Sequence, residues 1–254
     1  MKDVQNTQDT RNVDIQKVGI KHVELPLTVQ RKNKSDKVVY AEARVCVSLP
    51  RAYKGTHMSR FVEVLNEWRT KKLLGVDIKI VKKLHAQSGE LEFNFKYFID
   101  KKSPVTKLSA PMCYDCSFEG KMDGDDYKFI LGAKVPVTTL CPCSKEISEY
   151  GAHNQRALIS VKVSYDETEQ VWLEDLIELV ESCASCPLHP LLKRQDEKFV
   201  TEKAWENPKF VEDVLRDVVV KLREHPLIKE FEVDCEAFES IHNHSAWAYQ
   251  AETK

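Results

Sequence analysis

The sequence predicts an α+β fold in which antiparallel sheets are combined with pairs of helices. Both halves of the chain contain segments in which every second residue is apolar, as in half-buried strands. Between these segments, apolar residues recur at helical spacing. The same order of strand pairs and helix pairs occurs twice, although loosely in the second half. We therefore expect two tandem copies of one module, whose sheet edges are closed into a barrel by oligomerisation.

The first module is predicted to span residues 15–138, after a polar segment over 1–14 that we expect to be disordered. A helix over 58–74 follows from the spacing of Phe61, Leu65 and Trp68, and Gly75 stands where a helix would end. The other elements expected here are strands containing 18–20 and 39–47 with a turn at 31–37, a helix over 76–87, a strand over 91–97, and a hairpin of 105–119 and 127–137 that turns at 122–125.

The second module is predicted to span residues 139–254. Alternating apolar residues predict strands over 157–165 and 231–237, and helical spacing predicts helices over 173–185 and 208–224. The segment 193–198 is rich in charge, and we expect it to form a loop between helices.

Composition excludes several classes of protein. The 254 residues are 42% apolar and 31% charged, which is typical of a soluble globular protein and not of a disordered one. The formal net charge of −2 argues against binding to nucleic acid through bulk electrostatics. No segment has the roughly 20 apolar residues of a membrane helix, and the N-terminus lacks the apolar core of a signal peptide. We therefore expect a cytoplasmic protein with reduced cysteines.

The most informative segment runs from Thr139 to Arg156 and contains Cys141, Cys143 and His153. Thiolate and imidazole are the ligands that Zn(II) and similar metals prefer. A turn-rich stretch over 144–151 would let Cys141 and His153 converge on one ion, and an acidic third ligand would complete the site, with Glu197 as the candidate. The alternative is two loop thiols and a surface histidine without a metal.

Three other segments carry residues suited to chemistry. Near the C-terminus, Glu239 precedes His242 and His244, and on a strand these two histidines would share one face and titrate near neutrality. Lys54, His57 and Arg60 precede or open the first helix, where backbone amides and cations favour phosphate. Glu212 lies in the first turn of a later helix, and a carboxylate there also suits the helix dipole.

Two Cys-x-x-Cys pairs, Cys113/Cys116 and Cys183/Cys186, allow a four-thiolate zinc site. The pairs are separated by far more than the roughly 15–20 residues usual for such sites. Buried small side chains at chance spacing are therefore the default interpretation.

Taken together, the motifs resemble the type IB GTP cyclohydrolase I family, which are metal-dependent bacterial enzymes of the tunnelling-fold (T-fold) group. The resemblance covers nearly the whole chain. Its blocks are Lys54–Arg60, Thr139–Ser148, Gly151–Arg156, Pro190–Arg194, Asn207–Asp213 and Glu239–His244, together with shorter matches at 9–11 and 18–20. Two loop positions depart from the family pattern, Gln195 where proline is usual and His189 where an aromatic is usual.

The resemblance implies two tandem T-fold modules, a homotetramer with active sites between subunits, and conversion of GTP into 7,8-dihydroneopterin triphosphate and formate, the first step of folate biosynthesis. It implies one divalent metal per site (Zn, Mn or Fe), held by Cys141, His153 and Glu197, with a metal-activated water attacking guanine C8. Glu212 would bind the purine edge. Cys143, Glu239, His242 and His244 would be further active-site groups, and the candidate triphosphate ligands are Lys54, His57, Arg60, Lys145, Lys193 and Arg194.

Two other functions remain open at this point. One is another T-fold enzyme, such as a deazaguanine nitrile reductase, which would use a cysteine nucleophile and NADPH without a metal. The other is a non-catalytic module stabilised by zinc, which would unfold when the metal is removed.

Overall fold

The computed structural model describes residues 3–69, 72–73, 86–166 and 170–254. The chain forms two compact units, one made of Met1–Lys96 with Ser117–Leu131 and the other of Tyr97–Cys116 with Gly132–Lys254. The long strands β4 (Ser88–Lys102), β5 (Ser109–Asp123) and β6 (Asp126–Leu140) contribute residues to both. The predicted modules 15–138 and 139–254 divide the chain at a different point, and the duplication of one module stays a prediction.

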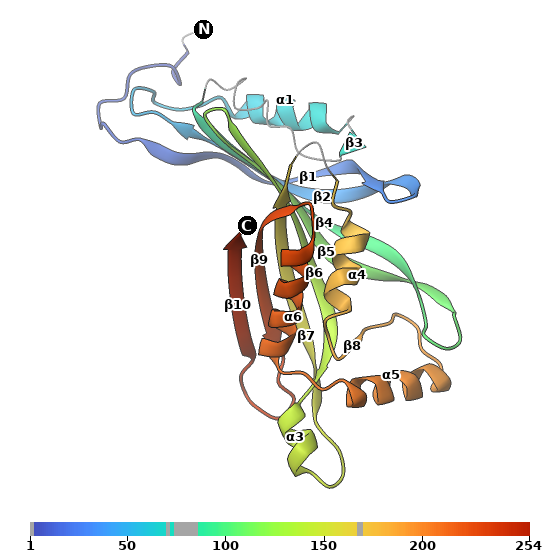
Figure 1. Cartoon of the computed structure of the whole chain (residues 1–254). Helices are drawn as coiled ribbons and strands as arrows, with labels where there is room; N and C mark the ends of the chain where they lie inside the picture. Colours follow the sequence, from blue (N-terminus) through green and yellow to red (C-terminus); the bar gives the residue numbers. More distant parts are fainter. Residues whose placement is uncertain (1–2, 70–71, 74–85, 167–169) are drawn as a thin grey trace. The chain divides into compact units, whose positions relative to one another are not determined.

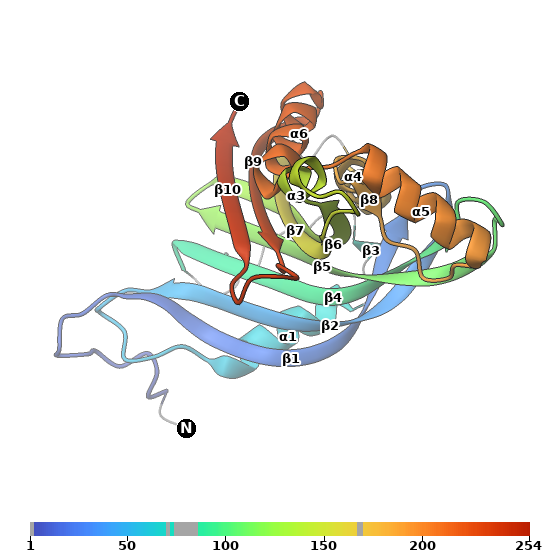
Figure 2. The same ribbon diagram turned by 90° about the horizontal axis from the view of Figure 1, so that it is seen from below.

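In the first unit the strand order is β6-β5-β4-β2-β1-β3. Here β1 (Ile15–Arg31) pairs antiparallel with β2 (Lys34–Leu49), β2 pairs antiparallel with β4, and β3 (Lys72–Leu73) pairs parallel with β1. Helix α1 (Met58–Trp68) lies along one face of β1 and β2 (Figure 2). The alternate residues Leu27, Ala43 and Val45 are buried, together with Phe61 and Leu65 of α1. The alternation that predicted these strands is therefore the alternation between core and surface.

Both predicted hairpins of this part of the chain are present, with tighter turns than expected. The β1–β2 turn uses only Lys32 and Asn33, and Asn33 has a φ of +53°. The expected turn over 31–37 was too long because residues 34–37, although polar, continue the pairing of β2 with β1. In the β5–β6 turn, Gly124 has a φ of +60°, a conformation that glycine adopts without steric cost.

The helix predicted over 58–74 begins as expected but ends early. Helix α1 ends at Trp68, and Leu73, which we assigned to the same helix, lies in β3 opposite Val29. The helix predicted over 76–87 falls almost entirely on residues 74–85, outside the described part of the chain.

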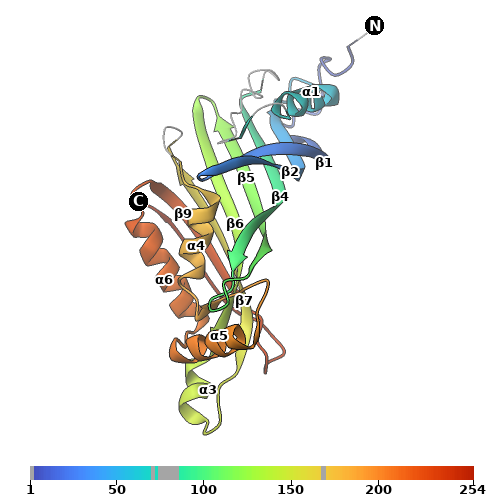
Figure 3. The same ribbon diagram turned by 90° about the vertical axis from the view of Figure 1, so that its right-hand side faces the viewer.

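In the second unit the strand order is β10-β9-β7-β6-β5-β4, and β8 (Cys186–Pro187) pairs with β6. The other elements are α3 (Pro142–Ile147), β7 (Asn154–Tyr165), α4 (Leu173–Glu181), α5 (Arg194–Glu206), α6 (Val211–Glu224), β9 (Ile228–Ala237) and β10 (Ala246–Thr253). Helices α4 and α6 lie side by side, and α6 packs on β9 and β10 (Figures 1 and 3). The predicted strands 157–165 and 231–237 are confirmed, and the helices predicted over 173–185 and 208–224 correspond to α4 and α6.

Four of the described elements of this unit were not predicted, and one of them is the two-residue strand β8. Helix α5 occupies the segment that we expected to be a loop, because only Asp196 and Ala204 of its 13 residues are buried and the apolar period is correspondingly weak. Strand β10 was not predicted because it has no clearly buried face: its aromatic residues Trp247 and Tyr249 are both exposed. The short helix α3 lies within the stretch expected to be turn-rich.

Asp196 fixes the start of α5. Its side chain is fully buried and accepts hydrogen bonds from the backbone N–H groups of Val105, Thr106 and Lys193, at 2.8–2.9 Å, and from the Thr106 hydroxyl at 2.6 Å. Burial alone would raise the pKa of this carboxyl, but the hydrogen bonds from Thr106, Lys193 and Val105 outweigh it and hold the pKa below its usual range. The ionised carboxylate therefore joins the β4–β5 loop to α5.

We expect Asp196→Asn to lower the Tm by roughly 5 °C near neutral pH, because an amide cannot accept all four hydrogen bonds. A carboxyl whose pKa is depressed on folding stabilises the protein above its unfolded pKa of about 3.9, and this stabilisation is lost as pH falls toward the lower folded pKa. The difference in Tm between the wild type and the variant should therefore shrink below about pH 4. Thermal unfolding at several pH values measures this, and a constant difference would contradict the assignment.

Candidate active site

Cys141 and His153 are held together by a small set of hydrogen bonds at the end of β6. The Cys141 N–H donates to the His153 carbonyl at 3.1 Å. Ser144 connects the same two residues, since its hydroxyl donates to the Cys141 carbonyl at 3.2 Å and accepts from the His153 N–H at 3.2 Å. Cys141 is also the N-cap of α3, and its Sγ accepts from the Ser144 N–H at 3.4 Å. The thiolate is the form of cysteine that binds metal.

The His153 ring has a partner on one side only. Its Nδ1 lies 3.0 Å from Oε1 of Gln155, and the Gln155 amide donates through Nε2 to the Thr139 hydroxyl at 3.1 Å. In the described part of the chain, no hydrogen bond engages Nε2 of His153. A metal-binding imidazole commonly has this arrangement, with one nitrogen hydrogen-bonded and the other open.

Other predicted site residues lie at the same end of the sheet. The Lys209 N–H donates to the Leu140 carbonyl at 3.0 Å, which brings the start of α6 and the exposed Glu212 beside the Cys141 loop. The Phe238 N–H donates to the Arg156 carbonyl at 2.8 Å, which fixes the segment after β9 against the start of strand β7. Figures 1 and 3 show α3 and α5 at this end of the second unit.

His242 and His244 lie in the loop between β9 and β10. The prediction that they share one face of a strand was therefore wrong, because this segment is not a strand. Strand β9 ends at Ala237, and β10 begins at Ala246. The two rings nevertheless stack, with centroids 5.2 Å apart and an interplanar angle of 23°, and both residues are exposed. In the same loop, Oε2 of Glu239 is buried and has no hydrogen-bond partner among the described residues. The loop therefore presents two imidazoles and an open carboxylate acceptor.

Glu197 is not brought to Cys141 and His153. It is exposed in the first turn of α5, eight residues before Trp205 and so about 12 Å from it along the helix axis. The α3 side chain of Lys145 reaches the other end of α5, where its Nζ donates to the Trp205 carbonyl and lies 4.7 Å from the centre of the Trp205 ring. Within the described ranges, no group of three or more His, Cys, Asp or Glu residues is arranged to hold a metal.

The other predicted site residues lie on α3 and around the start of α1. Cys143 is exposed on α3, and the eight cysteines, all within the described residues, form no disulfide bond. In the first unit, His57 is the N-cap residue of α1, and its ring pairs with Asp3 at 3.2 Å. Lys54 is exposed, and Arg60 is partly buried in the first turn of α1.

The second unit contains a cavity of about 880 Å³ beside the Cys141 loop. Thr138, Asn154 and Arg156 line it, whereas Thr139, His153 and Gln155 alternate with them and do not. His189 also lines the cavity, and its Nδ1 is buried without a partner among the described residues. Burial and the nearby Lys101 lower the pKa of His189, so this ring is held neutral. The open side of Cys141 and His153 is therefore distinct from this cavity.

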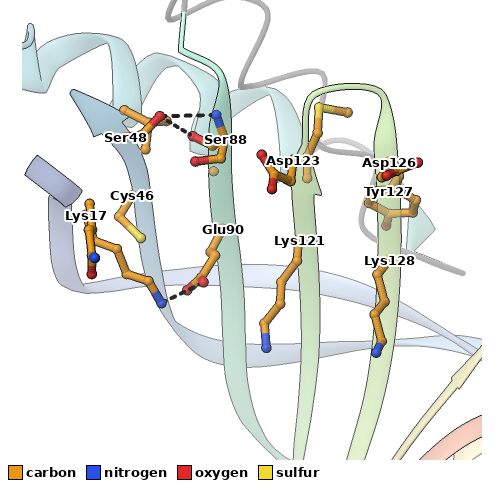
Figure 4. Close-up of a pocket in the computed structure, with 14 residues that line it drawn as sticks. Lys17, Cys46, Ser48, Ser88, Glu90, Lys121, Asp123, Asp126, Tyr127 and Lys128 are labelled. Carbon is orange, nitrogen blue, oxygen red and sulfur yellow. Dashed lines mark hydrogen bonds and ion pairs between the residues drawn. The ribbon is translucent and has the colours of Figure 1, made fainter. Parts of the chain in front are cut away.

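The first unit contains a smaller cavity of about 400 Å³ (Figure 4). Its charged lining residues balance, three lysines against three carboxylates: Lys17, Lys121, Lys128, Glu90, Asp123 and Asp126. Lys17 pairs with Glu90 at 2.6 Å, and Ser48 bonds the backbone of Ser88. This balance gives the cavity no preference for an anion.

Comparison with protein families identifies the chain. The family model described as type I GTP cyclohydrolase FolE2 matches residues 1–248, which include every predicted site residue. The chain belongs to the GTP cyclohydrolase FolE2 family. Among curated relatives, the GTP cyclohydrolase FolE2 of Geotalea uraniireducens is 52% identical over 252 residues, covering 98% of this chain and 92% of that protein. That of Thermosipho africanus is 50% identical over 254 residues, covering 98% and 96%.

Solved structures show that this FolE2 family member has the fold of urate oxidase, a T-fold protein. The uricase of Arthrobacter globiformis matches with a TM-score of 0.52 at 10% identity, covering 94% of this chain and 93% of that one. The urate oxidase of Bacillus sp. TB-90 matches with a TM-score of 0.54 at 10% identity, covering 94% and 100%. The predicted α+β T-fold is confirmed. Among the described residues of this FolE2 protein, no helix has the length and apolar character needed to span a membrane.

Sequence reasoning missed three residues of the site, Thr139, Ser144 and Gln155. Ser144 and Gln155 form hydrogen bonds with His153, and Thr139 accepts a hydrogen bond from Gln155. The signal available in the sequence was spacing, since Thr139 stands two residues before Cys141 and Gln155 two residues after His153.

Proposed function

We propose that the protein converts GTP and water into 7,8-dihydroneopterin 3'-triphosphate and formate, at the end of the sheet where β6, β7 and β9 meet. Membership of the FolE2 family and the names of relatives that are about half identical support this reaction. The observation that carries the proposal is the pair of Cys141 and His153, which one serine and one backbone hydrogen bond hold side by side.

These two residues fit a divalent metal, Zn(II), Mn(II) or Fe(II). A thiol at a helix N-terminus and an imidazole with an open nitrogen are suitable donors. Glu197 is proposed as the third donor, and its position about 12 Å along α5 from Trp205 favours its supply by another copy of the chain. A homotetramer with sites between subunits would satisfy this requirement. When bound, the metal would lower the pKa of a water and make it a nucleophile near neutral pH.

The protein's own residues would bind GTP and move protons. Glu212 would accept two hydrogen bonds from the guanine amino group and ring N–H, which orients the purine. His242 and His244 would give protons to the ring nitrogens as the bonds of C8 break and formate leaves. Glu239, whose buried oxygen has no partner in the described structure, would accept a hydrogen bond from the substrate or from water. Cys143 would lie at the rim, and the proposed triphosphate ligands are Lys54, His57, Arg60 and Lys145.

Metal removal tests this function directly. We expect chelator-treated protein to release neither formate nor dihydroneopterin triphosphate from GTP, and single additions of Zn(II), Mn(II) or Fe(II) to restore both products together. Circular dichroism of the stripped protein should show that it stays folded, because Cys141 and His153 lie outside the buried core. Folded protein that gives no product with any metal would contradict the proposal, and NADPH-dependent nitrile reduction would be assayed next. Unfolding on metal removal would instead indicate a structural zinc module.

A further inference from the structure

Each of the two proposed metal ligands stands just beyond the end of a strand, two residues from a polar residue inside that strand. Thr139 of β6 precedes Cys141 by two residues, and Gln155 of β7 follows His153 by two residues. Cys141 and His153 are joined by a backbone hydrogen bond, and Gln155 and Thr139 by a side-chain hydrogen bond of 3.1 Å. A pair of ligands at the adjoining ends of β6 and β7 is thus backed by a cross-strand pair of hydrogen-bonding side chains, Thr139 and Gln155.

The direction of the Gln155 amide determines the state of the histidine. Its Nε2 donates to the Thr139 hydroxyl, so its carbonyl Oε1 faces Nδ1 of His153 at 3.0 Å. A carbonyl oxygen can only accept, and Nδ1 must therefore carry the ring proton. A neutral imidazole has one proton, so Nε2 is left with the lone pair that a metal requires. Thr139 is only 1% exposed, which fixes this anchor within the core.

We propose that Gln155 is a positioning residue that selects the tautomer and ring orientation of His153, so that Nε2 is the metal-binding nitrogen. The proposal rests on the proposed metal site at Cys141 and His153. Gln155 acts on the ring alone, because the backbone of His153 is held separately by Ser144 and by Cys141. Loss of the amide should therefore free the imidazole while the loop keeps its conformation.

Cobalt(II) binding by the full-length chain tests the proposal without an activity assay. Wild type, Gln155→Leu and Gln155→Glu are stripped of metal and titrated with Co(II) against a competing chelator. The thiolate-to-cobalt absorption band reports occupancy of the site at Cys141. We expect Gln155→Leu to bind Co(II) about 10- to 100-fold more weakly, as is typical for the loss of a hydrogen-bond partner of a metal-binding histidine. Gln155→Glu should restore the affinity, because a carboxylate also accepts from Nδ1–H. Gln250→Leu, which alters an exposed glutamine on β10, is the matched control.

The outcomes separate this proposal from the metal site itself. Wild-type affinity in Gln155→Leu, with an intact cobalt band in the wild type, would overturn the role of Gln155 alone. Absence of the cobalt band in the wild type would overturn the metal site and the role together. Nitrogen NMR of the metal-free wild type gives a second test that needs no variant to fold. We expect His153 to be protonated at Nδ1, and protonation at Nε2 would overturn the proposal.

Discussion

Replacement of Cys141 by alanine is expected to abolish GTP turnover while the protein remains folded. The substitution removes the sulfur atom that caps α3 and that is proposed to bind the metal. A catalytic metal supplies several kcal/mol of stabilisation to developing charge, so its loss should lower the rate by about a thousandfold or more. The bond from the Cys141 N–H to the His153 carbonyl and the two bonds of the Ser144 hydroxyl do not involve the thiol, so we expect them to persist in the variant. Formate release, metal content and thermal unfolding would be measured together.

Cys113→Ala is the matched control, because Cys113 is an exposed cysteine on β5 outside the proposed site. This variant should keep both metal content and turnover. If Cys141→Ala still released formate from GTP at a substantial rate, the assignment of Cys141 as a metal ligand would be wrong. Lost turnover with full metal content would instead assign the cysteine a role other than metal binding.

The parts of the fold that could be predicted from the sequence are those in which burial alternates strongly. In β4 the residues Leu91, Phe93, Phe95 and Tyr97 are buried, and the residues between them are not, so the two-residue period of the strand is visible in the sequence. Helix α6 shows the helical period equally well, with Val214, Val218 and Leu222 on its buried side. Burial on one face is the cause of both patterns.

Prediction failed where tertiary contacts, and not periodic burial, determine the structure. Helix α5 has in its first turn the buried carboxylate of Asp196, a single residue whose hydrogen bonds to the β4–β5 loop leave no periodic pattern in the sequence. The predicted strand 231–237 ends where β9 ends, but the residues after Ala237 were read as continuing it, because they are mostly polar and such a segment can be a strand or a loop. As a result, the alternation of side chains along a strand was applied to His242 and His244, which lie in a loop.

The candidate site was predictable in its ligands and not in their support. Cys141 and His153 are chemically distinctive, and the structure places them together. Gln155 and Thr139 are common residues whose importance follows only from the pairing of two strands. Glu197 has the right chemistry for a ligand, yet a single chain leaves it apart from the others, and its role stays a prediction.

The second large effect is expected for Glu212→Ala, which should lower kcat/KM for GTP by about a hundredfold or more. Glu212 is exposed in the first turn of α6, three residues after Lys209, whose N–H donates to the carbonyl of Leu140, and we expect its carboxylate to accept two hydrogen bonds from the guanine edge. Hydrogen bonds to a charged group are the strong ones, and two of them act together here. Glu224→Ala, at the exposed last residue of the same helix, is the matched control and should leave kcat/KM unchanged.

Inosine triphosphate separates recognition of the purine edge from a general loss of activity. It lacks the 2-amino group of guanine, so the wild type should lose one of the two proposed hydrogen bonds with this nucleotide and turn it over less efficiently than GTP. In Glu212→Ala that hydrogen bond is already absent, and the preference for GTP should therefore nearly disappear. If the variant kept the full wild-type preference, Glu212 would not contact the amino group, and the purine would have to be oriented by another part of the site.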